Sequence, residues 1–178
     1  MTDPGSQSTY QVRLGWGAAG LTRLAESGIV VVIDVFDSAG GPAAELAAQA
    51  AALPHGPAVY IGSLRNATAT ARAVVDEQVA RGGRTSINLV LAGDDGDFSV
   101  EDFLAAGAIG DALSALGIDH SAPDVAVATE GFRPLTRALK HLLSASAAGI
   151  ELAQAGRPDE VKAASQLDAE AEANRLGQ

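Results

Sequence analysis

The sequence predicts an α/β fold with a mostly parallel central sheet and a helical C-terminal region. Three short apolar segments, 29–35, 58–62 and 86–91, have the length and the β-branched composition of buried strands. Helical patterns lie between these segments and continue after the last one. Strands that alternate with helices are typical of βαβ units, whose strands run parallel.

The strand elements follow from their borders as well as from their composition. The run 29–35 follows Gly28 and is apolar almost throughout, as expected for a strand covered on both faces. Segment 58–62 lies between a proline and a glycine, and segment 86–91 ends at an Ala-Gly pair. Residues 10–16 predict a fourth, peripheral strand.

Two helices are predicted between the strands. Residues 42–53 are rich in alanine and place Pro42 at the first helical position, where its missing N–H has no cost. Residues 66–80 predict an amphipathic helix whose buried face consists of Ala71, Val74, Val75 and Val79.

The last third of the chain reads as helical. Leucines recur at helical spacing over 135–143, and a further helix is predicted near 159–166. The final residues alternate alanine with charge, which leaves a helix and a frayed tail open. We expect one domain over 1–178, with flexible ends at 1–9 and 169–178.

Composition excludes several classes of function. The net charge is −10 and the pI about 4.6, which disfavours nucleic acids and anionic membranes as partners. Without cysteine there is no disulfide, thiolate metal site or cysteine nucleophile. No apolar run approaches the ~20 residues of a membrane span, and no secretory signal is visible, so we expect a cytoplasmic protein. Alanine-rich helices leave a homo-oligomer possible.

Asp34 lies near the carboxyl end of the first strong strand. Ligands of open α/β sheets bind at that edge, and a carboxylate there suits Mg²⁺, which takes one or two carboxylates together with waters and phosphate oxygens. The alternative is a solvated aspartate at a strand end. Asp37 follows and either shares a cation with Asp34 or only forms a turn.

The segment 93–102 places five carboxylates within nine residues between a strand and a helix. Ser99 and Asp102 fit a capping box, and acids in a first helical turn favour the helix dipole. The functional alternative is that Asp94, Glu101 or Asp102 faces the same sheet edge as Asp34. Glu101 and Asp102 differ by about 100° around a helix, so we do not expect both at one ion.

The segment Ser63-Leu64-Arg65-Asn66 closes the second predicted strand and begins a helix. Asn66 is a good N-cap, the N–H groups behind it can bind an anion, and Arg65 adds a cation for phosphate; capping alone explains Asn66 equally well. The three histidines are dispersed without metal-ligand spacing. No nucleophile elbow, P-loop or dinucleotide fingerprint is present.

Taken in order, several stretches resemble the 2-phosphosulfolactate phosphatase family, especially its short actinobacterial-type members. They are VRLGWGAAGLTRLA (12–25), VVVIDVF (30–36), VYIGSLRNATATARAV (59–74), LVLAGDDGDFSVEDFLAAGAIGDAL (89–113) and SASAAGIELAQAGRPDEVKAASQLD (144–168). The part over 96–108 is the most specific. The resemblance implies a three-layer α/β/α fold and a magnesium-dependent phosphatase acting on a small anionic phospho-acid.

Within that resemblance, the residues above take roles. Asp34 and Glu101 are expected to be catalytic, and Ser63, Arg65 and Asn66 to bind substrate. The expected metal ligands are Asp34, Asp94 and Asp102.

The sequence also departs from the family pattern. The Ala-Gly-Arg motif reads Ala-Gly-Asp94, Asp37 begins a segment that usually holds arginine or hydroxyl groups, and a middle region is missing. These departures keep open a non-catalytic homologue used for small-molecule binding or assembly. An acidic interaction module built on the C-terminal helices is a third possibility.

Overall fold

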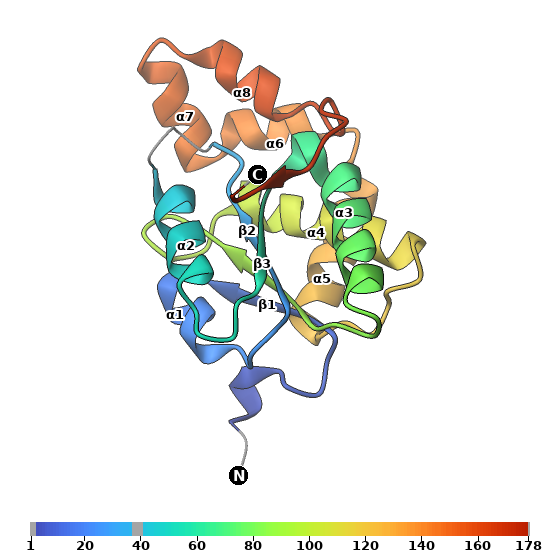
Figure 1. Cartoon of the computed structure of the whole chain (residues 1–178). Coiled ribbons are helices and arrows are strands. Elements are labelled where there is room, and N and C mark those ends of the chain that lie inside the picture. The colour runs from blue at the N-terminus through green and yellow to red at the C-terminus, as the bar shows by residue number, and fades with distance from the viewer. Residues whose placement is uncertain (1–2, 37–40, 178) are drawn as a thin grey trace.

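The fold, a computed structural model that describes residues 3–36 and 41–177, is built on a five-stranded sheet of order β1-β4-β2-β3-β5 (Figure 1). Four strands are parallel, and the short fifth one runs antiparallel to β3. Their bounds are β1 Val12–Trp16, β2 Ile29–Ile33, β3 Ala58–Gly62, β4 Ile87–Leu91 and β5 Asn174–Arg175. The predicted α/β fold with a mostly parallel sheet is therefore confirmed.

Helices cover both faces of this sheet. One face packs against α1 (Gly17–Arg23) and α2 (Pro42–Ala51), with Val30, Val32, Val59 and Val90 pointing toward them. The other face packs against α3 (Ala67–Ala80), α4 (Val100–Ala115) and α5 (Pro123–Phe132). Because successive side chains of a strand point to opposite faces, each strand contributes to both apolar clusters. The layers are therefore α/β/α.

The helical C-terminal region forms a cap over one end of the sheet. It comprises α6 (Leu139–Ala145), α7 (Ala147–Gln154) and α8 (Pro158–Ala164), which lie at the top of Figure 1. Short 3₁₀ turns occur at Pro4–Ser6 (η1), Leu64–Asn66 (η2) and Arg133–Leu135 (η3). No helix in the described ranges is long and apolar enough to cross a membrane.

Packing between layers depends on small residues. Gly107 and Gly110 of α4 face α5, and a Cβ at Gly107 would overlap the Ala128 carbonyl. On the opposite face, Gly20 of α1 lies directly against Gly15 of β1. These contacts let helices and strands approach closely where large side chains are scarce.

The buried face of α3 differs from the predicted one. Ala67, Thr70, Ala71 and Val74 are buried, whereas Val79 is 71% exposed. In the last turn of α3 it is Gln78 that faces the sheet, where its Oε1 accepts hydrogen bonds from Gln11 and Thr85, and Val79 lies on the solvent side.

The C-terminal segment forms neither the helix nor the frayed tail that the sequence left open. Its amides pair with the carbonyls of Leu64 and Arg65, and β5 then pairs with β3. Asp168 accepts hydrogen bonds from the Thr68 amide at 2.8 Å and the Thr68 hydroxyl at 2.7 Å. Asp168 therefore caps the first turn of α3 across one hundred residues of sequence.

Replacing Asp168 by alanine should lower the free energy of unfolding by about 1–2 kcal/mol, because α3 loses its distant cap and alanine must adopt a left-handed backbone conformation. Urea unfolding monitored by circular dichroism measures the change. Glu172→Ala is the matched control, since the exposed Glu172 side chain makes no hydrogen bond or ion pair with a described residue. Equal losses in the two variants would contradict the capping role.

Candidate active site

A cavity of about 290 Å³ opens where β2 and β4 end and α4 begins. Asp34 enters it from the end of β2, and the loop after β4 contributes Gly93 and Asp94. The first turn of α4 adds Glu101 and Asp102, and α7 closes the opposite side with Glu151. The predicted sheet edge thus brings together Asp34 and the acidic segment around the start of α4.

Asp102 is the residue that joins these elements. Its Oδ1 accepts a hydrogen bond from the Val35 amide and its Oδ2 one from the Gly93 amide, each at 2.9 Å. Its own amide donates to Ser99 Oγ at 3.3 Å, and the residue is 3% exposed. One carboxylate therefore ties the ends of β2 and β4 to the N-terminus of α4.

The predicted capping box forms only in half. Ser99 caps the Asp102 amide, as expected. The Asp102 carboxylate does not return to the Ser99 amide, because both of its oxygens are turned toward the strand ends. The Asp102 side chain therefore accepts hydrogen bonds from the ends of β2 and β4 and not from its own helix.

Burial raises the pKa of Asp102 to about 8, and the nearby Asp34 carboxylate adds to the rise. The hydrogen bonds from Gly93 and Val35 act in the opposite direction, because they favour the charged form. The negative charge of Glu101 raises the pKa of Asp102 further. The centre of the cavity therefore has an unfavourable concentration of negative charge.

Asp34 is half-buried just beyond β2, which ends at Ile33 rather than at residue 35. Its Oδ1 accepts the Phe36 amide at 3.0 Å, a local turn that directs the chain away from the strand. Asp37 lies outside the described residues.

Glu101 is 6% exposed, lines the cavity and accepts no hydrogen bond from any described residue. Its carboxylate oxygens do not belong to the fully buried polar atoms that lack a partner, so they open to the cavity, where water can reach them. Although Glu101 and Asp102 diverge around the helix, both reach the same cavity.

The loop after β4 places Asp94 at the rim of this cavity. Asp94 and Asp97 exchange backbone hydrogen bonds of 3.2 and 2.8 Å around a turn in which Asp95 and Gly96 have positive φ. Gly93 has φ +68°, and a Cβ there would overlap the Asp97 carbonyl. The turn therefore fixes the backbone that carries Asp94.

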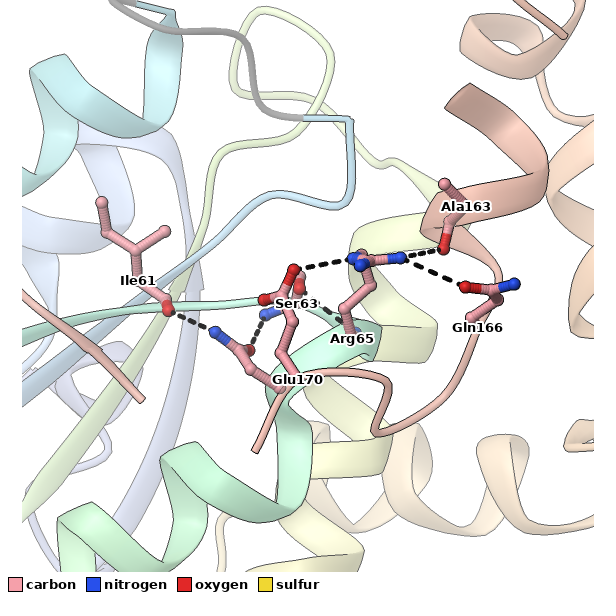
Figure 2. Close-up of polar contacts among 7 residues, drawn as sticks. Ile61, Ser63, Arg65, Ala163, Gln166 and Glu170 are labelled. Atoms are coloured by element: carbon pink, nitrogen blue, oxygen red, sulfur yellow. Dashed lines mark hydrogen bonds and ion pairs between the residues drawn. The ribbon is translucent and has the colours of Figure 1, made fainter. Parts of the chain in front are cut away.

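Ser63, Arg65 and Asn66 lie elsewhere and contact the chain itself (Figure 2). The Asn66 side chain accepts the Ser63 amide and donates to the Ile61 carbonyl, at 2.8 and 3.2 Å. Arg65 pairs with Glu170 at 2.8 Å and donates to the Ala163 carbonyl at 2.7 Å. The Arg65 contacts hold the C-terminal segment and those of Asn66 are local, and the described lining of the cavity contains none of the three residues.

Glu151 is a cavity residue that the sequence did not indicate. It lies on α7, about fifty residues after the acidic segment, in a helix without any motif. No lysine, arginine or histidine occurs among the described residues that line the cavity.

The donors available for a metal ion are carboxylate oxygens, which suit a hard cation such as Mg²⁺. Within 3–36 and 41–177, no three acidic or histidine side chains converge closely enough to form a metal cluster. A cation here would therefore depend on one or two carboxylates and on oxygens from water or substrate.

Comparison with known proteins adds a family assignment to this geometry. A family model described as 2-phosphosulpholactate phosphatase matches residues 43–171 of the 178-residue chain. The matched range contains Asp94, Glu101, Asp102 and Glu151, and it begins after Asp34. No curated protein matches the chain.

Without added metal, the protein should lose stability as the pH rises. Asp102 has a higher pKa in the folded protein than the value of about 3.9 in an unfolded chain, so the fold binds its proton more tightly. This contribution is complete below pH ~4 and is lost as the pH rises through about 8, at up to ~1.4 kcal/mol per pH unit. Urea unfolding at pH 5 and pH 8 measures it.

Asp102→Asn should show a smaller fall in stability between these two pH values, whatever its stability at pH 5. The exposed Asp119→Asn is the control and should retain the wild-type dependence. The same slope in Asp102→Asn as in the wild type would refute this assignment of the titrating group.

Proposed function

The chain belongs to the 2-phosphosulpholactate phosphatase family, and on that premise we propose that it hydrolyses a small phosphate monoester with the help of a magnesium ion. The observation that carries the proposal is the convergence of Asp34, Glu101 and Asp102 on one cavity at the carboxyl edge of a parallel sheet. Ligands of open α/β sheets bind at this edge.

Asp34 and Asp102 are the two carboxylates that would hold magnesium, whereas Asp94, the third expected ligand, lies at the rim of the cavity. Two of the lone-pair sites of Asp102 are occupied by backbone amides, and a carboxylate offers about four. The like charges of Asp34 and Asp102 favour a cation near both of them. When bound, magnesium would polarise the phosphoryl group and lower the pKa of a water.

Glu101 is suited to accept a proton from the attacking water, since its carboxylate opens to the cavity and receives no hydrogen bond from the described part of the chain. In the reaction, the water oxygen bonds to phosphorus and the ester P–O bond breaks. The leaving oxygen takes up a proton from solvent and departs as the alcohol, inorganic phosphate is released, and Glu101 returns its proton to solvent. Asp102 positions the start of α4, and with it Glu101, against the strand ends.

One observation favours a second candidate function, a non-catalytic homologue that keeps the scaffold. The described lining of the cavity contains no basic side chain, and Arg65, the expected phosphate partner, is bound to Glu170 instead. In that case, the acidic cavity would be a relic or a small-molecule binding site without turnover.

A magnesium titration followed by thermal melting, together with a phosphate-release assay on small esters, separates these functions. Magnesium should raise the Tm of the wild type, and Asp34→Asn should lose most of that rise. Glu101→Gln should keep the rise but lower kcat by about 10²–10⁴-fold. Asp119→Asn, an exposed carboxylate outside the cavity, is the charge-matched control.

No magnesium effect on Tm and no release of phosphate from any ester would decide for the non-catalytic homologue. Hydrolysis that is unaffected by Glu101→Gln would leave the phosphatase in place but remove the assigned base.

A further inference from the structure

Resting on the proposed function, we infer that α7 is a lid over the cavity, which rocks on α6 and α8 and closes against the loop after β4 when the cavity is occupied. Such a motion would admit a substrate and then separate it from bulk water. Three features of the molecule support it: the packing of α7, the joints at its two ends and an exposed ring on the opposite wall of the cavity.

α7 forms one wall of the cavity at the periphery of the molecule, where it lies beside α6 and α8 (Figure 1). Within Ala147–Gln154, all of which the structure describes, only Gly149 is buried. It packs against the Leu143 carbonyl of α6 rather than against the sheet, and Leu152 reaches the core only as a half-buried side chain. The neighbouring helices are anchored more firmly, because each places two buried side chains in the core: Leu139, Leu143, Val161 and Ala164.

Hydrogen bonds join α7 to its own ends and not to the rest of the site. The Gly149 amide donates to Ser146 Oγ at 3.1 Å, and the Arg157 amide donates to the Leu152 carbonyl at 2.9 Å. In the described ranges, no group of α7 forms a hydrogen bond or an ion pair with the sheet, with α4 or with the loop after β4. A helix with so few buried side chains belongs to the less stable part of a fold, from which moving elements are drawn.

The joints at both ends of α7 are suited to a hinge. Ser146 alone separates α6 from α7, and its extended backbone (φ −71°, ψ 161°) turns the chain between the two helices. At the other end Gly156 has φ +78°, and a Cβ there would meet no described atom within 4 Å. Hinges are formed by a few positions of this kind, at which changes in φ and ψ are absorbed. α7 can therefore rock while α6 and α8 stay in place.

An exposed aromatic ring lies on the wall that α7 would reach. Phe98 lines the same cavity as Ala147 and Ala148, and it is 62% exposed. The ring is held in place by Trp16 and Phe103, whose ring centroids are 5.4 and 5.5 Å away. Closure of α7 over this ring would remove apolar surface from water, which stabilises the closed form.

Glu151 couples closure to occupancy of the cavity. It projects from α7 into a cavity that Asp34, Asp94, Glu101 and Asp102 already line. Without a cation, closure moves one more carboxylate toward the others, and like charges repel more strongly as water leaves. A bound cation reverses the effect, because it attracts Glu151 together with the other carboxylates. α7 therefore opens over an empty cavity and closes over an occupied one.

Distances between spin labels test the motion, and a chain without cysteine carries labels only at engineered thiols. Ala19→Cys places one label at an exposed position of α1, whose first residue lies against Gly96 of the loop after β4. Ala153→Cys places the other at an exposed position of α7 outside the cavity lining. Magnesium and inorganic phosphate added to the full chain should shorten the mean distance between these labels by more than about 2 Å.

The matched control pair is Ala19→Cys with Lys140→Cys, whose second label lies at an exposed position of the anchored α6. Its distance should stay unchanged when magnesium and phosphate are added. An equal change in both pairs would indicate a movement of the whole C-terminal region and would overturn α7 as the moving element.

Glu151→Gln tests the role of charge in the absence of metal. In the metal-free protein this variant should already shorten the distance between the Ala19 and Ala153 labels, because closure no longer adds a charge. Glu172→Gln makes the same charge change outside the cavity and should keep the wild-type distance. Closure driven by magnesium with no change in metal-free Glu151→Gln would overturn the coupling through charge.

Phe98→Ala tests the contact made on closure. With magnesium and phosphate present, this variant should lower the ratio of closed to open forms by about three- to tenfold, because less apolar surface is covered. A ratio equal to that of the wild type would show that α7 does not close over the ring and would overturn the assigned closed form.

Label distances and catalysis separate the lid from the proposed function. Suppose that magnesium raises the Tm and phosphate is released, but the distance stays unchanged both with ligands and in Glu151→Gln. That outcome would overturn the lid and leave the phosphatase standing. A shorter distance in Glu151→Gln, without any magnesium effect on Tm or any release of phosphate, would support the lid and overturn the phosphatase.

Discussion

The Asp102 carboxylate is the point on which the site depends. By accepting the amides of Val35 and Gly93, it holds the ends of two neighbouring strands at the spacing that opens a cavity between them. Because Asp102 lies in the first turn of α4, the same contact fixes where that helix begins and hence where Glu101 points. An apolar side chain at this position would leave the two backbone amides without acceptors. Asp102 therefore has a structural role in addition to its proposed chemical one.

A second set of polar contacts performs a similar task on the other side of the sheet. Arg65 joins the end of β3 to Ala163 and Glu170 (Figure 2), and Asp168 joins the start of α3 to the C-terminal segment. The segment covers the edge of β3, which would otherwise expose unpaired backbone groups. This use of Arg65 removes a cation from the region where ligands bind, which is one physical reason why the cavity is acidic.

The sequence predicted what is encoded locally. The apolar run ending at Asp34 and the cap at Ser99 are short-range patterns, so the strand, the helix start and their common edge followed from them. Long-range contacts were not accessible in the same way. Asn66 was expected to cap α3 but turns back to Ser63, and its place is taken by Asp168, far along the chain. Glu151 belongs to a helix whose position depends on tertiary packing alone.

Family membership and the acidic cavity place different constraints on the substrate. The family assignment favours a phosphate ester, and phosphate requires positive charge that the described lining does not provide. A cation shared by Asp34 and Asp102 would meet this need, because it sits where the repulsion between carboxylates is already greatest. Under the proposed function, binding of the phosphate therefore depends on a cation held by these carboxylates rather than on a basic side chain of the described lining.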